Sequence, residues 1–204
     1  MDINEEQLLK KCQRHDLLAQ KELYIRYRPL FSIIVRRYIV DPDDAKDVLQ
    51  DSFLLIFKNI GMFRGDGSFE GWMKRIVINT SLQFLKSQKH RLMYLNIDDC
   101  ELSESQEVSE YDIYIDKNDG HSLLSGIELV RQAELHENDL IAIIQTLPDD
   151  FRQVFNLYFI DNFSHAEIAQ MLNIDEVTSR TRLVRAKKKV QTRLYKQCVD
   201  RLTV

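Results

Sequence analysis

The stretch TSRTRLVRAKKKV, Thr178 to Val190, places six cationic side chains in thirteen residues and contains no acid. At this density, arginine and lysine can bind phosphate groups, and arginine can also donate paired hydrogen bonds to base edges. Leu183, Ala186 and Val190 recur at three- and four-residue steps, which predicts one buried face of a helix. The cations occupy the remaining surface. The stretch therefore indicates either a helix that binds nucleic acid or the solvated face of an ordinary surface helix.

The segments before this helix favour the nucleic-acid interpretation. LPDDFRQVFNLYF, residues 147–159, predicts a helix that ends at a turn near Asp161. SHAE, starting at Ser164, is a capping box that begins a second helix, and Asn173 suits the left-handed residue that ends it. A helix, a tight turn and a cationic helix make a helix-turn-helix, whose second helix enters the DNA major groove.

A helix predicted over residues 41–58, DPDDAKDVLQDSFLLIFK, carries acids on one face. Asp41 is expected as its cap and Pro42 in its first turn. Opposite the apolar face lie Asp44, Asp47, Gln50, Asp51 and Leu54. Carboxylates at helical spacing repel one another, and an exposed leucine beside them is unfavourable in a free protein. Such a face suits docking on a basic partner, with a simply solvated face as the alternative.

A further helix is predicted over residues 69–91, and its polar residues share one face. They are Trp72, Arg75, Asn79, Gln83 and Lys86. An aromatic ring for stacking, amides for base edges and cations for phosphates are what a single-strand binding surface needs. The loop before it, FRGDGSF, contributes Arg64 and Ser68 and could hold an unstacked base. The alternative for Trp72 is a place in the hydrophobic core.

Composition and charge place these helices in two modules. The chain has 204 residues, of which 44% are hydrophobic and 29% charged, and only six Gly and three Pro. Residues 1–91 carry a net charge of +4, residues 92–139 of −11 and residues 140–204 of +3. We therefore expect an all-α fold of two small helical domains joined by an acidic linker that is extended or disordered.

The sequence offers no sign of a membrane, disulfide or metal protein. It has no apolar run long enough to span a bilayer and no apolar core of a secretory signal near its start. The three cysteines are far apart and lack metal-ligand spacing, which suggests a reducing compartment. We therefore expect a cytoplasmic protein with no metal and no cofactor.

Taken in order, these segments resemble a bacterial extracytoplasmic-function (ECF) RNA polymerase sigma factor. The resemblance covers roughly residues 10–91 and 138–197. It implies three parts: sigma region 2 at residues 1–91, which binds core polymerase and the −10 element; an acidic linker at 92–137; and sigma region 4 at 138–204, a helix-turn-helix that binds the −35 element. The implied function is to make core RNA polymerase specific for promoters and to help melt the −10 region.

The resemblance also implies roles for the faces described above. The acidic face at Asp44 to Leu54 lies where the family docks on the coiled coil of the largest polymerase subunit. The −10 surface comprises Arg64, Ser68, Trp72, Arg75, Asn79, Gln83 and Lys86. The −35 surface comprises Ser164, Thr178, Arg180, Thr181, Arg182, Arg185 and Lys188. Ser179 stands where the family usually has an apolar residue, and Val177 where it usually has glycine.

The implied partners are core RNA polymerase, promoter DNA and an anti-sigma factor, which a membrane-anchored protein could provide. We expect no small-molecule substrate and no catalytic residue, because no nucleophile–base pair, phosphate loop or metal cluster is apparent. Two other functions remain as alternatives. A transcription factor acting without polymerase would leave the acidic face without a purpose. A nucleic-acid-processing enzyme would have to use Asp44, Asp47 and Asp51 as metal ligands.

Overall fold

The computed structural model describes residues 4–95 and 134–202, and within these residues it contains helices and no strands. The all-α prediction is confirmed. The N-terminal half, residues 4–95, comprises α1 (Glu5–Gln13), α2 (Leu17–Tyr38), α3 (Pro42–Asn59), the 3-10 turn η1 (Ile60–Met62) and α4 (Phe69–Leu95). The C-terminal half, residues 134–202, comprises α6 (Glu137–Gln145), α7 (Asp149–Phe155), the π-helical turn η2 (Asn156–Ile160), α8 (His165–Leu172) and α9 (Glu176–Leu202). The predicted linker lies mostly outside the described residues.

The starts of α2 and α3 are fixed by aspartate caps. The Asp16 side chain accepts hydrogen bonds from the backbone N–H groups of Leu18 and Ala19, at the start of α2. Asp41 does the same for the first turn of α3, with Pro42 directly after it, as predicted. These carboxylates satisfy N–H groups that have no partner within the helix. The start of α3, and hence the direction of its acidic face, is therefore set by local sequence.

The apolar face of α3 is buried as the periodicity indicated. Its buried residues are Ala45, Val48, Leu49, Ser52, Phe53 and Ile56. Phe53 contacts the rings of Tyr24 and Phe31 on α2, with centroids 4.7 and 5.5 Å apart. Because α2 and α4 both pack on this face, the polar residues of α3 and α4 are turned outward. The packing of three helices thus presents the two predicted binding faces.

In the C-terminal half, the helix-turn-helix is confirmed. Ser164 and Glu167 form the predicted capping box at the start of α8, and Asn173 ends this helix in the left-handed conformation with φ 54°. Leu183 and Ala186 of α9 are buried against the domain. Their position turns the cationic side chains of α9 toward the surface. The turn before α8 also contains a left-handed residue, Asn162, at φ 60°.

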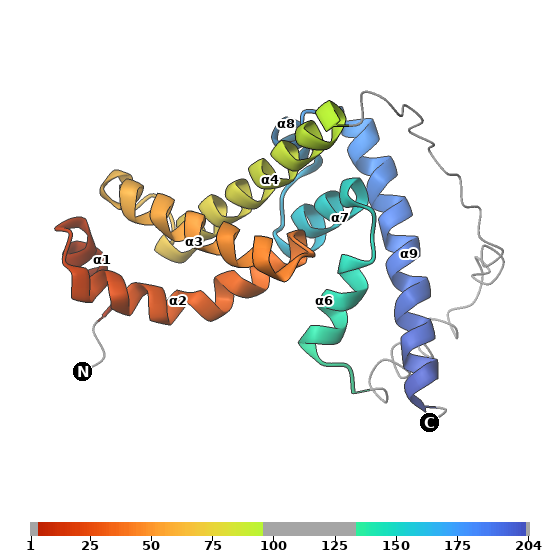
Figure 1. The fold of residues 1–204 in the computed structure, drawn as a ribbon, viewed down its shortest axis with the longest axis horizontal. Coiled ribbons are helices and arrows are strands. Elements are labelled where there is room, and N and C mark those ends of the chain that lie inside the picture. The colour runs from red at the N-terminus through yellow and green to blue at the C-terminus, as the bar shows by residue number, and fades with distance from the viewer. Residues whose placement is uncertain (1–3, 96–133, 203–204) are drawn as a thin grey trace.

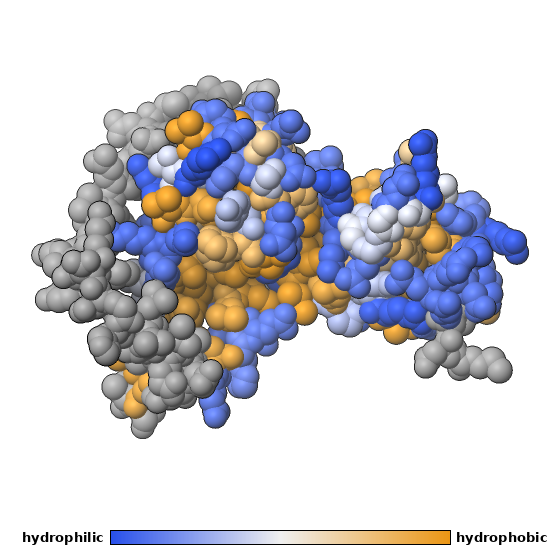
Figure 2. All heavy atoms as spheres, turned by 180° about the vertical axis from the view of Figure 1, so that it is seen from behind, coloured by the Kyte–Doolittle hydropathy of each residue, from blue (hydrophilic) through white to orange (hydrophobic). Residues whose placement is uncertain are grey.

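The two halves pack against each other where α2 ends. Figure 1 shows α7 lying between the end of α2 and the long helix α9. One hydrophobic cluster runs through both halves and includes Phe31 and Ile34 of α2 together with Val154 and Leu157 of the C-terminal half. Seen from behind in Figure 2, apolar residues continue across the junction of the two lobes. The described parts of the chain therefore share a continuous core.

Among the described residues, none of the helices combines the length and apolar character that a membrane span requires.

Candidate nucleic-acid interfaces and docking face

The acidic face of α3 is open to solvent. Asp47, Gln50, Asp51 and Leu54 are exposed, and Asp44 is half-buried. The Leu54 side chain is 59% exposed although it lies within a helix whose other face forms the core. The nearby ion pair between Lys46 and Asp43 lies to one side, at 2.8 Å, so it does not neutralise the face. A row of carboxylates around an exposed leucine is a surface that a cationic partner with an apolar patch would cover.

The predicted polar face of α4 is present, but its aromatic member is packed differently from the rest. Arg75, Asn79, Gln83 and Lys86 are exposed along the helix. Trp72 is half-buried, with ring centroids 5.6 Å from Phe63 and 5.9 Å from Phe69. Both interpretations of the tryptophan therefore hold in part, because one side of its ring packs in an aromatic cluster and part of it remains accessible.

The loop from Arg64 to Ser68 is exposed and shaped by glycine. Gly65 and Gly67 have φ of 85° and 94°, which side chains other than glycine rarely adopt. The Ser68 hydroxyl oxygen accepts a hydrogen bond from the N–H of Gly71 at 3.0 Å and so caps α4. Arg64 is exposed at the start of the loop. The loop thus presents polar groups beside the N-terminal end of the α4 face.

On α9, the predicted DNA-binding residues divide by their position around the helix. Arg180, Thr181, Arg185 and Lys188 are exposed. Arg182 instead turns toward α7, where its guanidinium lies 2.8 Å from the carboxylate of Asp150 and its side chain is only 25% exposed. This pairing follows from helix phase, because Arg182 lies three residues after the buried Ser179 and four before the buried Ala186. Arg182 therefore helps to hold α9 on α7.

Ser164 caps the start of α8, and Thr178 donates to the Asp175 carboxylate that precedes α9. The Ser164 hydroxyl donates to the Glu167 carboxylate at 2.8 Å and accepts from the Glu167 N–H at 3.3 Å. The Thr178 hydroxyl donates to Asp175 at 3.0 Å, in the first turn of α9. The backbone hydrogen bond from Thr178 is the main reason that the pKa of Asp175 is lowered. Both residues position the two helices of the motif.

Two valines on the outer face of α9 were missed by the sequence reasoning. Val177 is 72% exposed and Val184 is 66% exposed, the latter between Thr181 and Arg185. Apolar side chains on a recognition helix can contact the methyl group of thymine. The sequence pattern could have identified Val184, because helical periodicity places it off the buried face that contains Leu183 and Ala186.

Ser179, the departure from an apolar residue, has a partner in the structure. It is fully buried, and its hydroxyl lies 2.9 Å from Nδ1 of His165 on α8. The His165 ring stacks on Tyr158, with centroids 4.6 Å apart. Burial, with a further contribution from Arg180, lowers the pKa of His165. A neutral histidine thus satisfies the buried hydroxyl and joins the two helices of the motif.

Two family models match the halves that carry these faces. The model for sigma-70 region 2 matches residues 23–91, and the model for sigma-70 region 4 matches residues 137–190. The first contains the acidic face of α3 and the polar face of α4. The second contains the helix-turn-helix.

Known proteins align over nearly the whole chain. The ECF RNA polymerase sigma-E factor of Salmonella typhimurium is 27% identical over 194 residues, which is 94% of this chain and 95% of that protein. The RNA polymerase sigma-H factor of Pseudomonas aeruginosa is 28% identical over 193 residues, 93% of each chain.

A solved structure shares the fold. It is the sigma factor RpoE of Bartonella quintana, determined in complex with the anti-sigma factor NepR, and it matches with a TM-score of 0.50 at 18% identity. The match covers 86% of this chain and 96% of that one. With both sigma-70 regions in one chain and full-length relatives of this kind, the chain belongs to the ECF subgroup of the RNA polymerase sigma factors.

Proposed function

We propose that this protein binds core RNA polymerase and directs it to promoters by contacting the −10 and −35 elements. The observation that carries the proposal is the pairing, in one chain, of the two sigma-70 regions with three outward faces of suitable chemistry. These faces are the acidic face of α3, the polar face of α4 and the cationic outer face of α9. Each suits a different partner surface.

The acidic face of α3 is proposed to dock on the coiled coil of the largest polymerase subunit. Asp47 and Asp51 would contact cationic side chains there, while Leu54 would be covered by an apolar one. Charge complementarity of this kind speeds association and suppresses incorrect partners. Burial of Leu54 on docking would also remove the exposure that is unfavourable in the free protein.

The face of α4 and the adjacent loop are proposed to capture unstacked bases of the −10 element. Asn79 and Gln83 can donate to and accept from base edges, while Arg75 and Lys86 can contact phosphates. The accessible part of Trp72 would offer a stacking surface. Arg64 and Ser68 would hold a flipped base, and capture of such a base would stabilise the melted region.

The outer face of α9 is proposed to enter the major groove of the −35 element. Arg180, Thr181 and Arg185 would face base edges, and Lys188 would contact phosphate. Ser164 and Thr178 would contact the DNA backbone from the first turns of α8 and α9. Because phosphate contacts release counterions, binding by this face should weaken steeply with salt.

The remaining parts of the proposal concern compartment and regulation. The acidic segment between the halves would occupy a cationic channel of the polymerase that otherwise takes nucleic acid. An anti-sigma factor is a further proposed partner, and the proposed compartment is the cytoplasm, where the polymerase is found.

Reconstitution with core RNA polymerase tests the function directly. The chain should co-purify with core polymerase, and the complex should initiate at specific sites in a genomic DNA library where core polymerase alone does not. A gel-shift on a selected promoter, with and without core polymerase, separates this function from that of an independent transcription factor. Specific promoter binding that does not need polymerase would contradict the proposal, as would metal-dependent cleavage of the DNA.

A further inference from the structure

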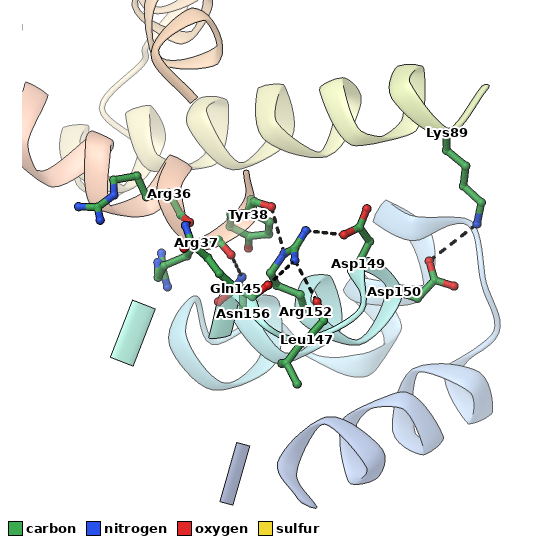
Figure 3. Close-up of polar contacts among 10 residues, drawn as sticks. All are labelled: Arg36, Arg37, Tyr38, Lys89, Gln145, Leu147, Asp149, Asp150, Arg152 and Asn156. Carbon is green, nitrogen blue, oxygen red and sulfur yellow. Dashed lines mark hydrogen bonds and ion pairs between the residues drawn. The ribbon is translucent and has the colours of Figure 1, made fainter. Parts of the chain in front are cut away.

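The C-terminal end of α2 is capped by side chains of the C-terminal half of the protein. Carbonyl groups in the last turn of a helix have no partner within that helix. Three successive carbonyls of α2 accept hydrogen bonds from the other half: Arg36 from Gln145 Nε2 at 2.8 Å, Arg37 from Asn156 Nδ2 at 2.8 Å and Tyr38 from Arg152 Nε at 3.1 Å (Figure 3). A guanidinium in this position also complements the negative end of the helix dipole. The end of α2 is therefore a specific contact for the C-terminal half.

A buried ion pair lies beside these caps. Arg37 Nη2 is 2.9 Å from Oδ1 of Asp161, and the two side chains are 7% and 9% exposed. The Tyr38 hydroxyl donates to the other oxygen of Asp161 at 2.7 Å. Burial, then the negative charge of Asp161, raises the pKa of Tyr38 well above its usual value, so this hydroxyl remains a donor. Removing Asp161 alone would leave a buried guanidinium without a counter-charge, which disfavours the closed contact.

The same contact is incompletely satisfied. Among the described residues, Nε and Nη1 of Arg37 and Oδ1 of Asn156 are buried without a hydrogen-bond partner. Buried polar atoms of this kind reduce the net stability of the contact that buries them. Once the halves separate, water can hydrate all three atoms. The junction is therefore specific in its geometry and still suited to reversible opening.

The closed arrangement also brings the two proposed DNA-binding surfaces together. Arg75 of the α4 face lies 3.5 Å from the Glu167 carboxylate and stacks over Phe163, with 5.5 Å from its guanidinium carbon to the ring centroid. Glu167 in turn bonds Ser164 of the proposed −35 surface. The −10 and −35 elements are about 25 base pairs apart, roughly 85 Å along B-DNA at 3.4 Å per pair. One closed molecule cannot contact both.

The connecting sequence permits the required separation. Residues 96–133 would reach about 125 Å if fully extended. The chain length between the halves is thus sufficient for the two surfaces to lie on elements roughly 85 Å apart.

We propose that the end of α2 is a latch, formed with Asn156 and Asp161, that holds the free protein closed and must open before both promoter elements are bound. The inference rests on the proposed function, because closure matters only if both surfaces bind one promoter. In the closed form, Arg75 is engaged by the C-terminal half. The acidic face of α3 remains exposed, so docking on polymerase is possible before opening.

Small-angle scattering of the full chain tests the latch itself. Asp161→Asn is nearly isosteric and removes the counter-charge of Arg37, so this variant should have a larger radius of gyration than wild type with the same helical circular dichroism. Arg37→Met combined with Asp161→Asn removes both charges and should restore the compact value, since no buried charge is then left without a counter-charge. Glu6→Gln, which neutralises an exposed acid on α1, is the matched control and should scatter like wild type.

Two scattering results would overturn the latch. One is a wild-type chain that is already extended. The other is an Asp161→Asn variant that is as compact as wild type. An open Asp161→Asn variant that the second substitution fails to close would also contradict the proposed role of Arg37.

A cross-link tests whether opening is required for initiation. Arg36 of α2 and Asn138 of α6 are both exposed and face each other across the junction, with a hydrogen bond of 3.2 Å between their side chains. Both would be changed to cysteine in a chain with Cys100→Ser, and joined by a short bismaleimide. The linked chain should still co-purify with core polymerase through α3 but lose promoter-directed initiation, while each single-cysteine chain, treated alike, should retain it. Normal initiation by the linked chain would overturn the inference, whereas failure of the unlinked wild type to bind polymerase would overturn the proposed function.

Discussion

Arg180 and Arg182 lie two residues apart on α9 and differ in what they contact. Arg180 is exposed and pairs with Glu176 of its own helix, at 2.7 Å. Arg182 pairs with Asp150 of α7 and is mostly covered. Breaking the exposed ion pair of Arg180 costs little free energy, so this side chain is available to bind DNA. Arg182 would lose a contact that holds its helix in place.

Single alanine variants should therefore separate three kinds of cation on α9. Arg180→Ala and Arg185→Ala should cost about 1–3 kcal/mol in holoenzyme binding and relax preference at particular −35 base pairs. Lys188→Ala should weaken binding to all sequences alike and reduce the salt slope by about one unit. Arg182→Ala should lower the melting temperature as well as the affinity. Each variant would be measured on a panel of −35 mutants at two salt concentrations.

The orientation would be contradicted if Lys188 and Arg180 exchanged their expected effects on sequence preference. If Lys188→Ala changed sequence preference and Arg180→Ala weakened binding uniformly, the proposed orientation of α9 in the groove would be wrong.

The His165–Ser179 pair predicts a pH dependence of stability. The pKa of His165 is lowered in the folded protein, from an ordinary value of 6.5, mainly by burial. The unfolded chain therefore binds the proton more readily than the native one. Stability from the neutral pair is fully present above about pH 6.5 and is lost as pH falls below that value. Thermal unfolding between pH 7.5 and 5 should shift more in wild type than in His165→Gln, and equal shifts would contradict this explanation.

At the level of elements, α3 offers a clean separation of folding from docking. Asp47 and Asp51 are exposed, while Val48 and Ser52 beside them are buried. Replacing both aspartates with arginine should abolish co-purification with core polymerase through charge repulsion. The free energy of unfolding should change little, since exposed side chains away from packing usually contribute about 0.5 kcal/mol or less. A helical double variant that still binds polymerase would refute the docking assignment.

The caps and turns explain why most elements could be predicted. Asp41, Ser164 and Asn173 act through their own backbone neighbours, so the sequence carries their effect locally. The π-helical turn at Asn156–Ile160 was not foreseen. It shifts the helix phase, and Tyr158 within it is 37% exposed. Such a turn depends on tertiary packing, and a local pattern gives no warning of it.

At the level of the whole molecule, the charge of the connecting segment should affect function more than stability. Ten acids lie between Asp98 and Glu128. Asp139, which the charge count had grouped with them, belongs to α6 and pairs with Arg201 at 2.8 Å. Changing the ten acids to their amides should weaken promoter-directed initiation and leave the melting temperature nearly unchanged. A large drop in melting temperature would instead mean that the segment packs on the helices.

The contact between the halves could not be predicted from the sequence. Arg37 and Asp161 are separated by 124 positions, and neither lies in a motif that suggests the other. The faces of α3, α4 and α9 follow from periodicity within single helices, so their residues could be chosen in advance. The pairing of Arg75 with Glu167 and of Arg182 with Asp150 depends on how helices pack, which periodicity does not fix.

The buried pair of Arg37 and Asp161 has a consequence for building hybrid factors. Exchanging the C-terminal half with that of a relative keeps both binding functions in principle, because each surface lies within one half. If the donor lacks an acid at the position of Asp161, the hybrid inherits an arginine with no counter-charge. We expect the two halves of such a hybrid to separate before it binds polymerase, while each half keeps its own binding specificity. Among natural relatives, the positions of Arg37 and Asp161 should therefore covary.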